Sequence, residues 1–326
     1  MTVAGFAGLV FSALPATPAI ALPAPESASC SWQATPIAVP PGAERRLVSV
    51  DTTDGAGSYF GHRAYGSGKA GLLRWQGDQP EEVALPKGSD SAMPADQNRS
   101  GTALINATVD GIRNEVFLYR KGKYETLPVP APYEKPRAVA INDRGDVVAM
   151  AEKPDSTGYV VIAWFAYGSG PLVISPPELP WASPVDIDQD GTILISGGYS
   201  AYLWRSGELS PLPPSPDVPV VTRALSKGRA VGTIIGEKAQ AVLWHLGSPH
   251  LLEGGGEAED INRHGLIAGS AGDWNGPPAV WRGTRLLAKL PLPQDATSAY
   301  PAIASDDGTI VGSAEPDIGP VRWRCT

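Results

Sequence analysis

The stretch that decides the fold is Ala138–Glu152, AVAINDRGDVVAMAE, followed by Val160–Ser175, VVIAWFAYGSGPLVIS. The first half predicts a strand, a turn ending at Gly145 and a second strand. The second half predicts a strand ending in Trp164, another turn and a fourth strand. An Asn side chain accepts hydrogen bonds from backbone N–H groups two residues on, and glycine supplies the positive φ that follows. We therefore expect one unit of four short strands.

The same unit recurs along the chain with two markers in register. The strand-three aromatics are Trp75, Tyr119, Trp164, Trp204, Trp244, Trp281 and Trp323, and the turn glycines are Gly55, Gly101, Gly145, Gly191, Gly228, Gly265 and Gly308. Successive aromatics are 37 (244 to 281) to 45 (119 to 164) residues apart. The copies lie near 48–86, 94–128, 137–174, 184–213, 222–252, 258–291 and 301–325. A four-stranded unit with this period predicts an all-β fold, a seven-bladed β-propeller, over a single domain at 30–326.

The ends of the chain predict how the ring closes. The last copy supplies three strands, and residues 31–39 resemble the missing fourth. We expect this N-terminal strand to complete the last blade, which leaves no open sheet edge. Closure would place Cys30 beside Cys325, the only two cysteines, and so predicts a disulfide in an oxidising compartment. Two unrelated buried thiols are the alternative.

The copies resemble the HAF-repeat proteins. The resemblance covers nearly all of 48–324 and is closest at Ile141-Asn142-Asp-Arg-Gly145, Ile261-Asn262-Arg-His-Gly265, Val231-Gly232 and Ala279-Val-Trp281. It implies an extracellular bacterial protein with a β-propeller fold. It brings no catalytic residues to carry over.

Composition narrows the class of partner. The net charge is -8 with 18% charged residues and no basic run, which disfavours nucleic acid and anionic membrane surfaces. The four histidines are scattered, and neither a Cys-x-x-Cys nor a Gly-x-Ser-x-Gly motif occurs. No cofactor is predicted, and we expect a monomer.

The first 29 residues predict a secretory signal peptide and a Pro-rich leader. They are apolar and uncharged until Glu26, with a small-residue cleavage signal near Ala21. Pro15 and Pro18 interrupt the apolar run and argue against a membrane-spanning helix. Secretion is the expectation; a lipoprotein anchored to the cell surface at Cys30 and a cytosolic protein are the alternatives.

Three carboxylates are expected near the central channel. Asp96, Asp186 and Asp260 stand at one position of the first strand in three copies, and in a propeller that strand lines the channel. They could bind a cation or polar ligand there. The alternative, which we favour, is that each Asp caps backbone donors of the next blade.

The stretch Asp186–Gly191, DIDQDG, allows two interpretations. Its three acids, Asp186, Asp188 and Asp190, resemble the start of a calcium loop, so Ca²⁺ is a candidate ligand. However, Asp188 and Gly191 align with the Asn and Gly of the repeated turn. An ordinary hairpin turn is the favoured reading.

The loops on one face carry the best candidates for ligand contact. Connections between blades and between second and third strands share that face, and aromatic rings flanked by polar groups suit a carbohydrate or peptide. The predicted ligand-binding residues are Trp181, Trp274, Tyr133, Glu134, Asp273 and Arg63.

These features favour a secreted, non-catalytic propeller that binds an extracellular glycan, peptide or protein through its loop face. The main alternative is a hydrolase or lyase acting on a polysaccharide, with Glu134, Glu152, Asp155 or Asp273 as acid or base. Two of these carboxylates converging beside a cleft would favour the enzyme. A purely structural protein would have a plugged face without a pocket.

Overall fold

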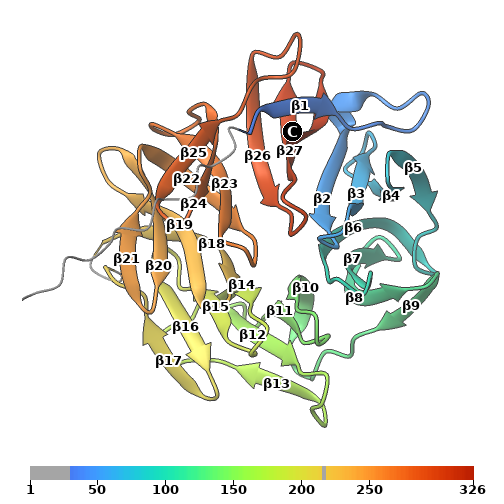
Figure 1. Cartoon of the computed structure of the whole chain (residues 1–326). Coiled ribbons are helices and arrows are strands. Elements are labelled where there is room, and N and C mark those ends of the chain that lie inside the picture. Colours follow the sequence, from blue (N-terminus) through green and yellow to red (C-terminus); the bar gives the residue numbers. More distant parts are fainter. Residues whose placement is uncertain (1–29, 215–217) are drawn as a thin grey trace, which may run out of the picture. The chain divides into compact units, whose positions relative to one another are not determined.

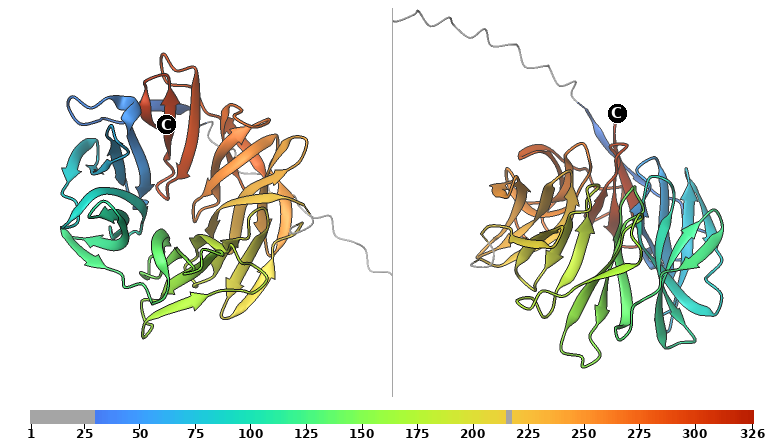
Figure 2. Two further views of the ribbon diagram at one scale, coloured as in Figure 1. Left: turned by 180° about the vertical axis from the view of Figure 1, so that it is seen from behind. Right: turned by 90° about the horizontal axis from the view of Figure 1, so that it is seen from below.

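Seven four-stranded antiparallel sheets stand around a central channel, which confirms the predicted seven-bladed β-propeller (Figure 1). The computed structural model describes residues 30–214 and 218–326. Residues 31–326 form one compact unit. Figure 2 shows the same ring from behind and from below. The signal peptide and leader predicted at 1–29 lie outside the described residues.

Each blade runs in chain order from the channel outward, except the last. Blades 1 to 3 are β2 (Val48–Thr53), β3 (Ser58–Ala64), β4 (Ala70–Gln76), β5 (Gln79–Val83); β6 (Ser89–Gln97), β7 (Ala103–Val109), β8 (Arg113–Arg120), β9 (Lys123–Thr126); and β10 (Glu134–Ile141), β11 (Val147–Glu152), β12 (Tyr159–Trp164), β13 (Pro171–Ile174). Blades 4 and 5 are β14 (Ser183–Ile187), β15 (Ile193–Ser196), β16 (Ala201–Arg205), β17 (Glu208–Pro211); and β18 (Val220–Ser226), β19 (Arg229–Ile235), β20 (Ala239–His245), β21 (Ser248–Leu251). Blades 6 and 7 are β22 (Gly255–Ile261), β23 (Leu266–Ala271), β24 (Pro278–Arg282), β25 (Arg285–Lys289); and β26 (Ser298–Ala304), β27 (Ile310–Glu315), β28 (Gly319–Cys325), β1 (Trp32–Pro36). Among the described residues the only helix is a 3-10 turn at Arg45–Leu47.

The N-terminal strand closes the ring as predicted. β1 pairs with β28 from Trp32 opposite Cys325 to Pro36 opposite Val321, and Ser31 and Thr326 exchange two backbone hydrogen bonds of 3.1 Å. Both cysteines are disulfide-bonded, which confirms the predicted pair. In the other blades a short turn joins the third and fourth strands at this end. In blade 7 the disulfide occupies that place.

The strand-three tryptophans join consecutive blades. Trp75, Trp244, Trp281 and Trp323 are fully buried. The indole N–H groups of these four and of Trp164 donate to the chain that enters from the preceding blade. The pairs are Trp75 to Ala38 O (2.7 Å), Trp164 to Pro128 O (3.0 Å), Trp244 to Pro213 O, Trp281 to Glu253 O (3.0 Å) and Trp323 to Pro291 O (2.7 Å). Each ring therefore supplies buried apolar area and also satisfies a connecting carbonyl.

The asparagines of the first turn stabilise two blades at once. The Oδ1 atom of Asn142 accepts hydrogen bonds from the backbone N–H groups of Arg144 (3.0 Å) and Asp146 (2.9 Å), as the repeat predicts. Its Nδ2 donates to the carbonyl of Asp188 in the next blade (2.9 Å). This second contact, repeated at Asn98 and Asn262, ties neighbouring turns together around the ring.

Every inner strand contains a β-bulge at the same height. The pairing with the second strand skips one residue in each blade: Asp51, Ala95, Val139, Val185, Arg223, Glu259 and Ala302. In four blades a second-strand glycine lies against this bulge: Gly61, Gly232, Gly269 and Gly312. A Cβ atom there would lie 1.9 Å from a backbone carbonyl oxygen in blade 1 and 2.1 Å in the other three, so glycine permits the close approach.

Replacing Gly232 by alanine is therefore expected to destabilise the protein by about 2 kcal/mol or more, as overpacking of a rigid backbone does. Its Cβ would meet the carbonyl oxygen of Val221 at 2.1 Å. The matched control is Gly236→Ala, where the nearest atom, the Lys238 oxygen, is 3.5 Å from the new Cβ. Urea unfolding should separate the two variants. Equal midpoints would contradict the proposed role of glycine at the bulge.

Candidate functional site

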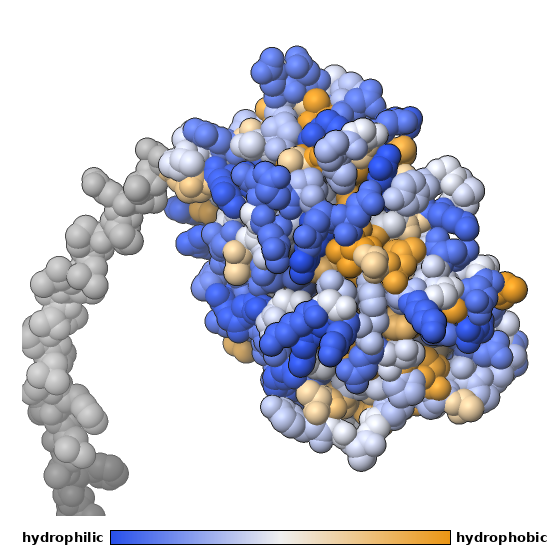
Figure 3. Space-filling model, turned by 90° about the vertical axis from the view of Figure 1, so that its right-hand side faces the viewer, coloured by the Kyte–Doolittle hydropathy of each residue, from blue (hydrophilic) through white to orange (hydrophobic). Residues whose placement is uncertain are grey.

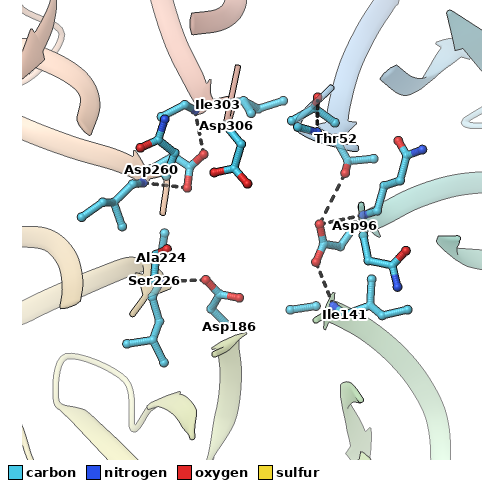
Figure 4. Close-up of a pocket in the computed structure, with 18 of the residues that line it drawn as sticks. Thr52, Asp96, Ile141, Asp186, Ala224, Ser226, Asp260, Ile303 and Asp306 are labelled. Atoms are coloured by element: carbon cyan, nitrogen blue, oxygen red, sulfur yellow. Dashed lines mark hydrogen bonds between the residues drawn. The ribbon is translucent and has the colours of Figure 1, made fainter. Parts of the chain in front are cut away.

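The bulges place three carboxylates around one end of the channel. Asp96, Asp186 and Asp260 directly follow the bulges of blades 2, 4 and 6, and they come from three sides of the cavity (Figure 4). Each accepts one backbone N–H from its own strand: Gln97 (2.7 Å), Ile187 (2.7 Å) and Ile261 (2.8 Å). Each also accepts one from the next blade: Ile141 (2.8 Å), Leu225 (2.6 Å) and Ala304 (2.7 Å). The sequence offered ligand binding and capping of the next blade as alternative roles for these residues, and the hydrogen bonds to the next blade show the capping.

Burial raises the pKa of all three carboxyls above the usual range. It raises the pKa of Asp96 to about 7 and that of Asp260 to about 6, although the backbone donors act in the opposite direction. Burial, followed by the charge of Asp96, raises the pKa of Asp186 well above its ordinary value. Near neutral pH the three groups therefore share fewer than three negative charges.

The channel cavity has a volume of about 420 Å³ and is strongly polar. Its lining contains eight acidic side chains and four basic ones. Most of the basic groups at its rim are paired: Arg99 with Asp143 (Nε–Oδ2 2.5 Å), Arg263 with Asp306 (3.3 Å) and Arg223 with Glu259 (3.3 Å). The excess of acids favours a cation or a hydrogen-bond donor over an anion.

The suggested calcium set does not converge. Asp186 faces the channel, whereas Asp188 accepts the N–H groups of Lys227 (3.1 Å) and Gly228 (2.5 Å) in the next blade. Asp190 pairs with Arg205 (2.5 Å). Within residues 30–214 and 218–326, no group of three or more His, Cys, Asp or Glu side chains is arranged to hold a metal ion. DIDQDG is thus a blade turn whose acids have three separate roles.

Trp181 lies on the loop face, as predicted, and is 52% exposed. It packs edge-on against Tyr159 with ring centroids 5.3 Å apart. The same two residues form a parallel bridge, since the Tyr159 N–H donates to the Pro180 carbonyl (3.0 Å). The connection between blades 3 and 4 is therefore held against strand β12, and one side of the indole stays open to solvent.

Trp274 and Asp273 lie on the opposite side of the ring, in the loop between β23 and β24 of blade 6. Trp274 is 43% exposed. The Asp273 carboxylate accepts the N–H groups of Trp274 (2.9 Å) and Ala239 (3.2 Å), which lower its pKa. Asp273 thus ties this loop to blade 5, and only the tryptophan is free for ligand contact.

The other three predicted ligand residues are not gathered into one site. Arg63 lies inside strand β3 and not in a loop, with its guanidinium over the ring of Tyr65 (5.4 Å). Tyr133 is half-buried and packs against the core of blade 3. Glu134 is exposed at the first residue of β10. The glycines around β3 suggested a loop there, but they fit a strand that runs against the bulge.

The carboxylates considered for catalysis are occupied by local contacts. Glu152 pairs with Lys135 (2.7 Å) and accepts from Ser156 (2.7 Å), which lower its pKa. Asp155 accepts the Thr157 hydroxyl (2.7 Å) and N–H (3.1 Å), with the same effect. Glu134 stands opposite Glu152 on the neighbouring strand. A general acid needs a raised pKa, and neither Glu152 nor Asp155 has one.

A groove on the loop face was not foreseen from the sequence. It lies between blades 2 and 3 and has a volume of about 560 Å³. We call it the blade 2 groove; its lining is the start of β8 (112–116), the chain around the end of β9 (126–129) and the start of β10 (134–136). Only the exposed, apolar Ile112 at the hairpin tip hinted at it, at 85% exposure.

A disulfide indicates an oxidising environment. No helix in the described ranges is both long and apolar enough to cross a membrane.

Comparison with known proteins establishes the fold class. No family model matches the chain, and no curated protein matches it. Among solved structures, YCF48 bound to D1 peptide gives a TM-score of 0.57 at 11% identity, covering 95% of this chain and 99% of that one. Oligogalacturonate lyase from Vibrio parahaemolyticus gives 0.56 at 7%, covering 91% and 97%. The β-propeller domain of the trilobed protease from Pyrococcus furiosus gives 0.54 at 14%, covering 76% and 86%. At these identities the similarity concerns the propeller fold alone.

Proposed function

We propose that this propeller is a secreted, non-catalytic binding protein that holds an extracellular peptide or protein on its loop face. One observation carries the proposal. Six large hydrophobic side chains are exposed on loops of that one face: Tyr65, Ile112, Trp181, Tyr199, Trp274 and Leu292. Exposed aromatic and aliphatic residues spaced around a rigid ring are typical of a surface that a partner covers.

Two further points support binding over catalysis. Among the solved structures of this fold, one is a propeller bound to a peptide. A polysaccharide hydrolase or lyase would need two carboxylates facing one cleft. Of the four candidates, only Glu134 lines the blade 2 groove, and Asp273 lies on blade 6. Secretion and membership of the HAF-repeat family are part of this proposal. Secretion is supported by the disulfide, and family membership by the repeat residues Ile141-Asn142 and Ile261-Asn262.

The test is a peptide and glycan array probed with the oxidised mature protein and three variants. Trp181→Ala and Trp274→Ala are each expected to weaken binding to peptide spots about tenfold, which is about 1.4 kcal/mol. Tyr167→Ala is the matched control, because Tyr167 is 93% exposed but lies in the turn between β12 and β13 on the opposite face. Unchanged binding by both tryptophan variants, or binding to glycans alone, would overturn the proposal.

A further inference from the structure

In blade 2 the fourth strand leaves part of the outer edge of the third strand, β8, uncovered. Strands β7 and β8 pair along their whole length, up to Val109 opposite Arg113. The fourth strand, β9, ends earlier, and its last pair is Thr126 opposite Phe117. One more backbone hydrogen bond follows, from Leu127 N–H to the Val116 carbonyl (2.9 Å). Residues 113–115 of β8 extend beyond it without a neighbouring strand on that side.

The chain leaves this edge for an identifiable reason. The carbonyl of Pro128, which points away from β8, accepts the indole N–H of Trp164 in blade 3 (3.0 Å), so the chain turns towards the next blade. In blade 3 the corresponding edge is covered, because Trp181 bridges to Tyr159. The opening beside β8 coincides with the blade 2 groove.

The ladder fixes which backbone groups face the opening. In an antiparallel pair, alternate residues direct their N–H and C=O groups to the same side. Because the Val116 carbonyl accepts from Leu127 on the outer side, Asn114, two residues earlier, also faces outward. Asn114 is exposed. An extended chain lying in the groove can exchange hydrogen bonds with both of its backbone groups.

The groove selects the side chains of such an occupant. Its walls include the apolar residues Val116, Leu127, Pro128, Val129 and Pro136. Of its charged residues, Arg113 pairs with Asp110 (3.1 Å) and Glu115 (3.0 Å), and Lys135 pairs with Glu152. Glu134 makes no ion pair with any described residue. The groove therefore presents the carboxylate of Glu134, which makes no ion pair in the described part of the chain, beside an apolar surface.

We propose that the blade 2 groove binds an extended peptide segment, which adds a strand to the edge of β8 at Asn114, places an apolar side chain against Leu127 and Val129, and directs a Lys or Arg side chain at Glu134. The proposal rests on the peptide-binding function and names the subsite. Figure 3 shows the side of the ring on which the outer strands of blades 1 and 2 lie, where hydrophobic residues gather within a hydrophilic surface.

The test uses the oxidised mature protein and a library of capped pentapeptides with apolar residues at positions 2 and 4 and Lys at position 3. Asn114→Pro removes the outward N–H without removing a bond of the β7–β8 ladder, and it is expected to weaken binding at least tenfold. Asn114→Ala keeps the N–H and should bind as the wild type does. Glu134→Gln should weaken binding three- to tenfold and reduce its salt dependence.

A second arm does not depend on the variants folding. N-methylation of the peptide backbone should abolish binding to the wild type, since it removes the donor that strand addition needs. Equal binding by the methylated peptides, or by Asn114→Pro, would overturn strand addition. If array peptides bind through Trp181 or Trp274 while Asn114→Pro has no effect, only this subsite fails. If no peptide binds at all, the proposed function fails with it.

Discussion

Replacing Cys30 and Cys325 by serine is expected to lower the midpoint of thermal unfolding by about 10 °C, measured by calorimetry at constant pH. The disulfide joins β1 to β28 and so encloses almost the whole described chain. On the chain-entropy model, losing the constraint on so long a loop costs about 5–6 kcal/mol, and each kcal/mol moves the midpoint by about 2 °C in a protein of this size. Without the bond, the ring is held closed by the ladder between these two strands and by the packing of blade 7 against blade 1.

Reduction of the wild type provides the control, because the chain contains no other cysteines. A reducing agent should lower the wild-type midpoint to that of the double variant and leave the variant itself unchanged. Backbone amides of residues 32–35 should then exchange with solvent faster than those of β26, since the outer strand opens first. An unchanged midpoint in the reduced wild type would show that strand pairing and blade packing close the ring without the bond.

The repeat made the architecture predictable because each of its markers has one dominant physical role. A turn Asn followed by Gly specifies the first hairpin, and a Trp of strand three fills the contact to the preceding blade. A blade cannot bury both faces alone, so the copies must stack on one another, and four strands per copy are typical of a propeller. The incomplete last copy then required a strand from the other end of the chain.

The bulges and the groove were not predictable, because no one residue type marks either of them in all seven blades. The skipped positions hold residues as different as Asp51, Val139 and Arg223. The uncovered edge at Asn114 arises from two lengths, those of β8 and β9, and from a contact between Trp164 and Pro128 in different blades. The lengths of two neighbouring strands and the contacts between blades become known only once the pairing of the strands is known.

The loop-face residues were foreseen in part, for a related reason. Exposed Trp181 and Trp274 stood out because they fall outside the repeat register. Arg63 was misplaced because glycines lie beside and within β3. The close approach of the inner strand, which requires one of them, Gly61, cannot be read from one copy. Residues that break a repeat are thus better guides to a surface site than glycine content is.

The three channel carboxylates should make the protein lose stability as the pH rises from about 5 to 7. Their pKa values in the folded state lie above the ordinary value for aspartate, so between about pH 4 and 7 the folded protein binds more protons than the unfolded chain does. Stability therefore falls with rising pH across that window and is greatest towards its acidic end. Each fully protonated carboxyl contributes about 1.4 kcal/mol per pH unit, so the three together reach on the order of 3 kcal/mol between pH 5 and 6.

The measurement is the free energy of urea unfolding at pH 5, 6 and 7 for the wild type and for the triple variant Asp96→Asn, Asp186→Asn, Asp260→Asn. The variant should lose most of the slope. Burial also raises the pKa values of Glu259 and Asp306, so a smaller slope should remain. Asp155→Asn is the matched control, because hydrogen bonds from Thr157 lower the pKa of Asp155 and its effect falls below this window.

The slope of the unfolding free energy against pH, and not its value at one pH, identifies the role of the three channel carboxylates. An Asn at these positions still accepts one of the two backbone N–H groups but turns its own NH₂ toward the other, which shifts the stability at every pH. A change in slope can come only from groups that titrate differently in the folded and unfolded states. Parallel profiles for the wild type and the triple variant would mean that the carboxylates stay ionised, as strong acceptors of the N–H groups of Ile141, Leu225 and Ala304. A steeper profile in the wild type would mean that protonation of these three carboxyls stabilises the folded protein. Their contacts to the next blades would then be the part of the channel whose stability depends on pH.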